Sequence, residues 1–348
     1  MEQRATKWQL AGAYLGGTIG AGFASGREHL QFFLAYGKDG YLGVALAGGL
    51  LALFGGALLS LAYRHQTRSH SDLLRAIAPP GLVLLFDCVL CLVTLTSVSV
   101  MMAGGAALFE QAGAGAPLGA VAMGASAALI VALGFVKMLR INGAITAVLT
   151  AFIAWVGFAA ATQPHAAPLM ARAAGIDWTP GAWYGAAALY GAYNITFSFA
   201  LFGALGSGIR AAPDARFGGI AGGIALGALS FVVCLAVETA LPEAAASDVP
   251  MLMVVERMGN WPTRLYVVSV WLAMLTTAVT GVYTLARRAE SWSRLPLGLC
   301  GFAVALAAFP LALLGFQFLV ATLYPLAGYV GLGCVAVALL ARGAARRI

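Results

Sequence analysis

The chain of 348 residues is 61% hydrophobic and only 9% charged, against roughly 25% charged residues in an ordinary soluble domain. This composition excludes a soluble globular protein and indicates an integral membrane protein. The alternating pattern of a membrane barrel is missing, so the spans must be helices that satisfy their own backbone hydrogen bonds. We therefore expect an all-α membrane protein.

Ten apolar segments are long enough to span a hydrocarbon core of about 30 Å, which takes about 20 residues. They are residues 8–36, 40–63, 82–109, 117–137, 142–162, 179–207, 216–240, 262–287, 295–314 and 316–341. No linker or soluble domain separates them. We expect a single transmembrane domain over residues 1–348.

The placement of the basic residues predicts the topology. The net charge is +7, and an inner N-terminus leaves only Lys38, Arg172, Arg257 and Arg264 in the outer segments. The positive-inside rule then predicts a multi-pass protein of the cell (inner or plasma) membrane with both termini in the cytoplasm. Topology accounts for the basic excess, so we expect no nucleic-acid partner and no obligatory protein partner beyond the surrounding lipid.

The first span contains the glycine-rich run GGTIGAGFASGRE, residues 16–28. Each glycine lowers helix stability by about 1 kcal/mol relative to alanine, so this run predicts a break in the helix. Close helix packing through Gly16, Gly20 and Ala24 is an alternative. A secretory signal cleaved near Ala24 is a second alternative, against which the helical continuation from Glu28 onward argues.

The sixth span resembles the first because polar residues interrupt it. Gly191, Asn194, Thr196 and Ser198 lie near its middle. With ten spans, two halves of five, residues 8–162 and 179–341, have opposite orientations, which permits an inverted repeat. Interrupted spans at corresponding positions of the halves mark discontinuous helices and a binding site near the bilayer midplane. We therefore predict a 5+5 inverted repeat with discontinuous helices 1 and 6.

A broken first helix offers backbone N–H groups to an anionic group of a substrate. The pocket around it is predicted to include aromatic and polar side chains of spans three and six. The predicted substrate-binding residues are Gly20, Gly22, Phe23, Ala24, Ser25, Ser97, Tyr190, Tyr193, Asn194 and Phe197. Aromatic residues in membrane spans also serve packing, which is the alternative for each ring.

Span eight carries a stripe of small and hydroxyl residues in the run SVWLAMLTTAVTGVYT, residues 269–284. The stripe shares one helical face: Ser269, Ala273, Thr276, Thr277, Thr280 and Thr284. Its hydroxyls can bond the carbonyl four residues back along their own helix. Alternatively, the hydroxyls of Thr276 and Thr277 can join the carbonyls of Gly16, Ile19 and Ala273 in an oxygen cage for a hard alkali cation.

Charged residues inside a span are costly and are candidates for function. Arg27 and Glu28 are predicted to form an external gate, or else to pair with each other and reach the interface. Asp87 and Glu238 are weaker candidates. His29 could carry a proton, although a polar contact of the outer helix is the simpler interpretation.

The spans contain no paired acids or His-x-x-His set of the kind an intramembrane enzyme would need, so we expect no enzyme. Cys88 and Cys91 have the spacing of a metal or redox pair. No second pair or nearby histidine joins them. We expect buried thiols and no disulfides.

The run GTIGAGFASGREHLQFF, residues 17–33, resembles the N-terminal signature of the YkvI-type membrane proteins, an amino-acid permease branch of the amino acid–polyamine–organocation superfamily. The resemblance implies the leucine-transporter fold and alternating access. In sodium-coupled members a cation lies between span one and an Ala-x-x-Thr-Ser/Thr motif on span eight. The matching residues here are Gly16, Ile19, Ala273, Thr276 and Thr277. Some proton-coupled relatives instead place a lysine in span five, and residues 142–162 contain none.

Together these patterns predict a secondary-active symporter of a small amino-acid-like substrate with sodium as the coupling ion. A proton-coupled transporter and a ligand sensor on the same fold remain open as alternatives. The sequence alone does not identify the substrate.

Overall fold

The computed structural model describes residues 5–78, 80–134, 136–162 and 181–345, and these residues are helical apart from turns, short loops and one isolated bridge between Ala5 and Ile209. The all-α expectation is confirmed. Arg172, one of the basic residues of the predicted outer segments, lies outside the described residues.

Seven described helices are long and apolar enough to cross a membrane. They are α4 (Lys38–Arg64), α6 (Val83–Gln111), α7 (Ala116–Gly134), α9 (Trp183–Leu205), α10 (Ala212–Glu238), α13 (Asn260–Ser293) and α15 (Phe316–Ala345). Two further predicted spans correspond to α8 (Val136–Ala161) and α14 (Leu297–Ala312), in which the described apolar stretches are shorter. The count of ten spans therefore stays a prediction.

The first predicted span consists of short helices instead of one continuous helix. These are α1 (Lys7–Thr18), α2 (Ala21–Ser25), α3 (Arg27–Phe32) and the 3₁₀ turn η1 (Leu34–Tyr36). The breaks fall at Ile19–Gly20 and at Gly26, within the glycine-rich run. At Gly26 the backbone φ is +79°, a left-handed conformation that costs a residue with a side chain roughly 1–2 kcal/mol. Both breaks thus lie where glycines weaken the helix.

The prediction that the sixth span is discontinuous is wrong for the described residues. Helix α9 runs without a break from Trp183 to Leu205. The amide of Asn194 donates to the carbonyl of Tyr190 at 2.9 Å, and the hydroxyl of Thr196 donates to the carbonyl of Ala192 at 2.8 Å. These polar groups are satisfied by their own helix, so they give no reason for it to unwind.

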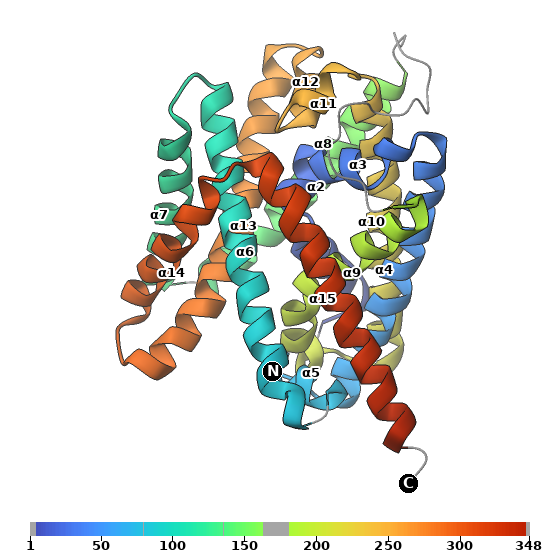
Figure 1. Ribbon diagram of the computed structural model, residues 1–348, viewed down its shortest axis with the longest axis vertical. Coiled ribbons are helices and arrows are strands. Elements are labelled where there is room, and N and C mark those ends of the chain that lie inside the picture. Colours follow the sequence, from blue (N-terminus) through green and yellow to red (C-terminus); the bar gives the residue numbers. More distant parts are fainter. Residues whose placement is uncertain (1–4, 79, 135, 163–180, 346–348) are drawn as a thin grey trace.

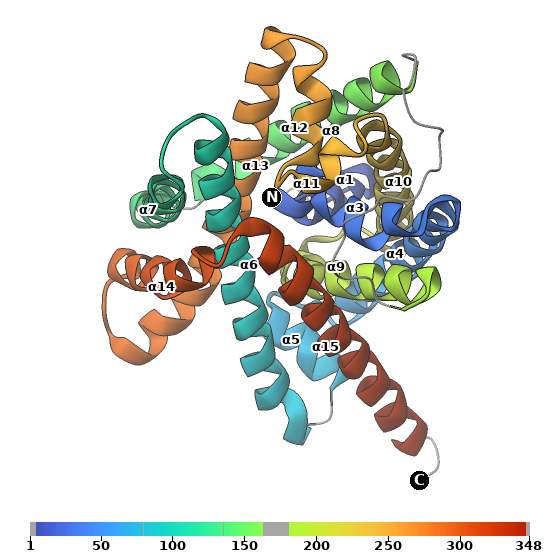
Figure 2. The same ribbon diagram turned by 45° about the horizontal axis from the view of Figure 1, so that its top comes forward.

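Helices at corresponding positions of the two predicted halves contact each other. Helix α4 packs on α10, α6 on α13, α7 on α14, and α1 on α9. Figures 1 and 2 show α7 and α14 together at one side, while α4, α9 and α10 surround the broken first span on the other. This pairing is what a two-fold relation between halves would produce. The 5+5 repeat itself remains a prediction.

The contact between α4 and α10 is made by glycines. A Cβ placed on Gly223 would lie 2.2 Å from the backbone nitrogen of Ala52, and one on Gly227 would lie 2.8 Å from the Cα of Gly48. Such close backbone approach is available only to small residues. These glycines therefore allow α10 to pack closely against α4 beside the broken span.

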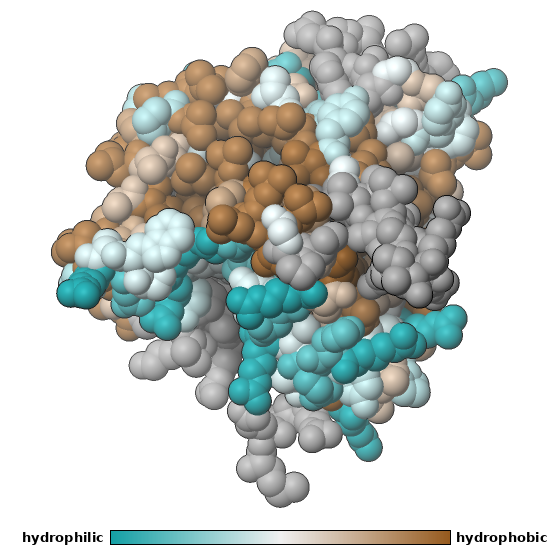
Figure 3. Space-filling view, turned by 60° about the horizontal axis from the view of Figure 1, so that its bottom comes forward, coloured by the Kyte–Doolittle hydropathy of each residue, from teal (hydrophilic) through white to brown (hydrophobic). Residues whose placement is uncertain are grey.

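Three short helices lie at the two ends of the bundle. Helix α5 (His70–Ile77) lies at the end where α1 begins and α15 finishes, and α11 (Glu243–Ala246) and α12 (Pro250–Glu256) lie at the opposite end (Figure 1). Hydrophobic residues cover the flank and hydrophilic residues gather over the α5 end (Figure 3). Large hydrophobic side chains such as Leu53, Leu84 and Leu306 are exposed, which fits a surface that contacts lipid.

Helix α12 is short and mostly apolar. Its residues Met251, Leu252, Val254 and Val255 are each at most 3% exposed, because the helix packs on α2, α10 and α13. Its apolar face is therefore covered by protein.

Candidate functional site

The first span is buried over nearly all of the part that follows its first break, at Ile19–Gly20. Gly20 is partly exposed, whereas every residue from Ala21 to Ala35 is buried. Helix α12 closes over the second break, where a Cβ on Gly26 would lie 2.9 Å from Cγ of Met251. The broken segment is thus closed toward α12, the predicted outer side.

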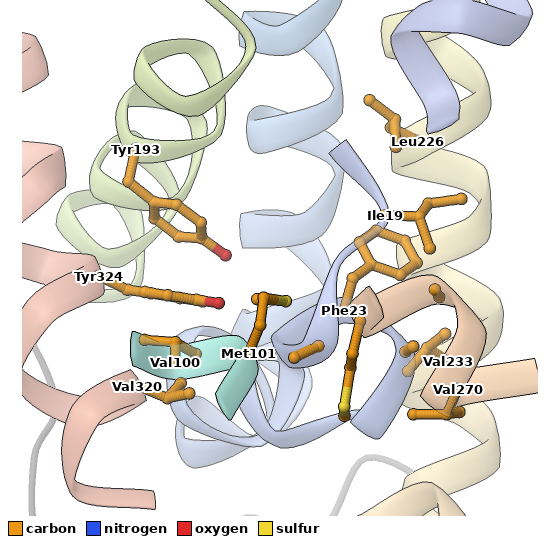
Figure 4. Close-up of a cluster of buried hydrophobic side chains, with 14 of the residues drawn as sticks. Ile19, Phe23, Val100, Met101, Tyr193, Leu226, Val233, Val270, Val320 and Tyr324 are labelled. Atoms are coloured by element: carbon orange, nitrogen blue, oxygen red, sulfur yellow. The ribbon is translucent and has the colours of Figure 1, made fainter. Parts of the chain in front are cut away.

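Aromatic rings converge on the broken segment from three elements. The ring of Phe23 lies 4.7 Å from the imidazole of His29, and the rings of Tyr190 and Tyr193 on α9 are 5.3 Å apart, all measured between centroids. Tyr324 of α15 lies 4.8 Å from Tyr193. In Figure 4 the rings of Tyr193 and Tyr324 lie side by side, with their hydroxyl ends pointing toward the space beside Phe23. The predicted residues Phe23, Tyr190 and Tyr193 therefore share one aromatic cluster.

Glu28 points its carboxylate into this cluster. Its Oε1 accepts a hydrogen bond from the hydroxyl of Tyr190 at 3.4 Å, and its Oε2 accepts one from the hydroxyl of Tyr193. The side chain is 2% exposed, so it does not reach the interface. A Cβ on Gly22 would lie 2.8 Å from Oε2, which places the carboxylate directly against the broken backbone.

Arg27 extends in another direction. Its Nη1 donates to the carbonyl of Ala245 at 2.7 Å and to that of Ser247 at 3.2 Å. Asp248, the next residue in this loop, lies outside the spanning helices. Burial raises the pKa of Asp248 above its ordinary value, and the nearby Arg27 partly opposes this. Arg27 thus ties the broken segment to the loop between α11 and α12.

The other predicted substrate residues are less clearly directed at the cluster. The hydroxyl of Ser25 bonds the carbonyl of Gly22 at 3.0 Å and so braces α2. Asn194 bonds its own helix, while Phe197 is 5.6 Å from Tyr193 at the edge of the cluster. Ser97 is partly buried on α6, one turn before Met101.

The predicted cation ligands on α13 bond to their own helix. The hydroxyls of Thr276 and Thr277 both donate to the carbonyl of Ala273, at 2.8 and 3.2 Å. Thr280 and Thr284 continue the pattern toward the carbonyls of Thr276 and Thr280. Each hydroxyl oxygen keeps lone pairs for a cation. Thr276 is 5% exposed, so any cation there would be largely dehydrated.

The remaining ionisable candidates lie away from the cluster. Asp87 accepts from His70 at 3.1 Å and from Arg288 near the α5 end. Glu238 accepts from Tyr41 of α4 at 2.5 Å. No group of three or more His, Cys, Asp and Glu residues that could hold a metal occurs in the described part of the chain. Cys88 and Cys91 are free thiols, and the prediction that both are buried is wrong, because Cys88 is exposed and Cys91 is only partly buried.

Three residues in contact with the broken segment escaped the sequence analysis. Tyr324 precedes Pro325 in α15, and a helix-interior proline could have drawn attention to it. Tyr266 of α13 donates to the carbonyl of Ala24 at 2.6 Å. The end of the Met101 side chain would lie 3.6 Å from a Cβ on Gly20. Tyr266 and Met101 carry no pattern that distinguishes them from ordinary apolar packing.

Solved structures with a similar arrangement of helices include transporters. Mhp1, a nucleobase-cation-symport-1 family transporter, matches 88% of this chain and 72% of its own at a TM-score of 0.63 and 13% identity. MhsT in complex with L-phenylalanine matches 95% of this chain and 89% of its own, at a TM-score of 0.61 and 16% identity. The manganese transporter of Eremococcus coleocola matches 93% of this chain and 75% of its own, at a TM-score of 0.58 and 15% identity. The chain is a membrane protein with the leucine-transporter type of fold that these transporters share.

Sequence comparison points to two relatives from Bacillus subtilis (strain 168). The chain is 27% identical to the uncharacterized membrane protein YkvI over 352 aligned positions, which cover all of this chain and 99% of YkvI. It is 23% identical to the uncharacterized protein YyaD over 94% of this chain and 93% of YyaD. No family model matches. The resemblance to YkvI-type proteins expected from the glycine-rich run is confirmed along the whole chain.

Proposed function

We propose that the protein is a secondary-active symporter of a small amino-acid-like substrate that works by alternating access. Two observations carry this proposal. The first span is broken next to the rings of Phe23, Tyr190 and Tyr193, and the fold resembles that of solved transporters. The substrate site comprises the backbone from Gly20 to Ser25 and these rings. MhsT was solved with L-phenylalanine, which supports an amino-acid-like ligand.

Sodium is the coupling ion in this proposal, held by the carbonyls of Gly16, Ile19 and Ala273 and the hydroxyls of Thr276 and Thr277. The neutral oxygens of Ala273 and Thr276, which are buried, and of Thr277, which is partly buried, suit a hard alkali cation. The cation-symport family of Mhp1 supports cation coupling in this fold. Arg27 and Glu28 form the closed outer side, since both are buried, Arg27 bonding the end of α11 and Glu28 bonding α9.

Uptake into proteoliposomes tests the proposal. Purified protein is reconstituted and supplied with L-phenylalanine and a panel of small neutral amino acids, with and without an inward sodium gradient. We expect at least one substrate to accumulate only when the sodium gradient is present. Accumulation that follows a proton gradient and ignores sodium would overturn the coupling ion, and binding without flux would identify a ligand sensor.

A further inference from the structure

Glu28 is a buried acid whose described hydrogen bonds all come from neutral groups. The hydroxyls of Tyr190 and Tyr193 supply them. An ionised carboxylate that is removed from water without a paired cation carries a penalty of several kcal/mol. Two phenol donors reduce this penalty but bring no positive charge.

Among the residues that the structure describes, the hydrogen bonds to Glu28 come from Tyr190 and Tyr193, and none comes from a cationic side chain. On α3, the Nη1 of Arg27 bonds carbonyls of the outer loop. The imidazole of His29 is fully buried among rings, and neither of its nitrogens has a hydrogen-bond partner in the described residues, which favours its neutral form. The remaining groups nearby are neutral: Tyr190 and Tyr193 on α9, Tyr324 on α15, and Cys234 on α10 beside Tyr190. Glu238 on α10 accepts from Tyr41 and lies away from the cluster.

The space beside the carboxylate on the Gly22 side is full. A Cβ on Gly22 would lie 2.8 Å from Oε2 of Glu28 and 2.7 Å from Cε2 of Tyr324. One additional carbon atom therefore does not fit between the broken backbone and this carboxylate. A proton needs no such space, because it occupies a hydrogen bond that already exists.

We propose that Glu28 is a proton-binding site of this protein, loaded while the broken segment is closed under α12 and emptied to water when α3 separates from α9. On loading, the carboxylate takes a proton from water as the segment closes, becomes a carboxylic acid and donates to the oxygen of Tyr190 or Tyr193, since a phenol oxygen also accepts. On separation, the proton passes to water and the carboxylate is hydrated. The site is distinct from the predicted sodium ligands on α13.

The existence of the site does not depend on transport, and only its coupling to a substrate rests on the proposed function. If both hold, each transport cycle moves a proton through Glu28 in addition to any cation bound at Thr276 and Thr277. A pH gradient would then drive or oppose uptake even when sodium is equal on both sides.

Infrared difference spectroscopy of the full-length protein in lipid tests the site directly. The carbonyl stretch of a protonated carboxylic acid is separate from the carboxylate bands and shifts in deuterated water. We expect a protonated band at neutral pH that disappears in Glu28→Gln. Glu238→Gln, which alters another buried glutamate bonded to a tyrosine, should retain that band.

A spectrum in which Glu28→Gln leaves every protonated carboxyl band unchanged would overturn the inference. Because glutamine keeps the shape of glutamate, elution as a single species in detergent checks that the variant is folded. If it is not, Glu28→Asp provides the second test, since a shorter acid should move the band rather than abolish it. An unmoved band would again overturn the inference.

Uptake at equal sodium tests the coupling. We expect wild-type accumulation to change with an imposed pH gradient and Glu28→Gln to lose this response. If substrate is transported but its uptake ignores the pH gradient, the coupling fails while the proposed transport function stands. If no substrate is transported but the infrared band depends on Glu28, the proton site stands and the proposed function fails.

Discussion

Arg288 of α13 forms an ion pair with Asp87 of α6 near the α5 end, where Asp87 is buried and Arg288 is partly buried. His70 of α5 bonds the other oxygen of the same carboxylate at 3.1 Å. One acidic residue thus joins three helices at the predicted cytoplasmic side. Opening of the bundle at this end would have to separate them.

Replacement of Asp87 by asparagine should loosen this junction and lower stability by about 2 kcal/mol, the usual value of a hydrogen bond to a charged group. Cys91 is half-buried one turn along α6, so it should react faster with a maleimide in Asp87→Asn. Labelling rates are measured with the exposed Cys88 replaced by serine. Arg287→Gln is the matched control, because Arg287 pairs with Glu290 of its own helix. Equal rates in all three proteins would show that the junction does not restrain this end.

The predicted sodium ligands can be tested by removing two hydroxyl groups. Thr276→Val together with Thr277→Val should abolish the sodium dependence of substrate binding or uptake while the protein stays folded, because both hydroxyls bond only their own helix in the described contacts. Thr284→Val, further along the same stripe and also bonded to its own helix, should leave the dependence intact. Thermal shifts with and without sodium report it, because a cation that binds only the folded state raises stability. An unchanged sodium shift in the double variant would exclude these ligands.

The hydroxyls of Thr18 and Ser198 lie 3.0 Å apart and join the end of α1 to the middle of α9. Each is at most 9% exposed, and a buried hydrogen bond contributes about 1 kcal/mol. Thr18→Val and Ser198→Ala should each lower the unfolding midpoint, and a double-mutant cycle should show a coupling of about that size. Purely additive effects would mean that the two hydroxyls do not depend on each other.

A methyl group at Gly223 should disrupt the contact between α10 and α4. Its Cβ would meet the backbone nitrogen of Ala52 at 2.2 Å, and overpacking of this kind costs about 1–3 kcal/mol. Gly49→Ala on α4 is the control, because nothing lies within 4 Å of a Cβ there. It should be neutral or slightly stabilising, since alanine favours a helix. Unfolding midpoints in detergent compare the two variants, and equal midpoints would contradict the contact.

Asp248 should make stability depend on pH. Because burial raises its pKa in the folded protein, the neutral acid is favoured by folding. Its stabilising contribution is fully present below the pKa of about 4 that an aspartate has in the unfolded chain. The contribution is lost as the pH rises through the higher pKa of the folded protein. The unfolding midpoint of wild type should therefore fall over this window relative to that of Asp248→Asn. Glu256→Gln, an exposed acid on α12, controls for removal of one charge and should follow wild type.

Much of the fold could be predicted from local properties of the sequence. Hydropathy identifies the apolar helices, because the energy of burying each segment in lipid is a sum over its own residues. The glycines from Gly16 to Gly26 predict the break in the first span for the same reason, since helix propensity is set by residues near one another in the chain.

The polar residues of the sixth span show where this reasoning fails. Asn194 and Thr196 resemble the interruption of the first span in composition, yet α9 is continuous because their side chains bond carbonyls within the helix. Composition does not distinguish a polar group that bonds its own backbone from one that leaves the backbone free.

Only the tertiary structure decided which side chains meet at the broken segment. Tyr324 reaches Tyr193 from the far end of the chain, and Glu28 turns toward α9 instead of toward the water at the predicted outer surface. The sequence by itself determined a helical membrane protein with a weak first span, because hydropathy and helix propensity are local. The environment of Glu28 depends on how α3, α9 and α15 pack, and packing between distant segments follows from the whole fold and from no single run of residues.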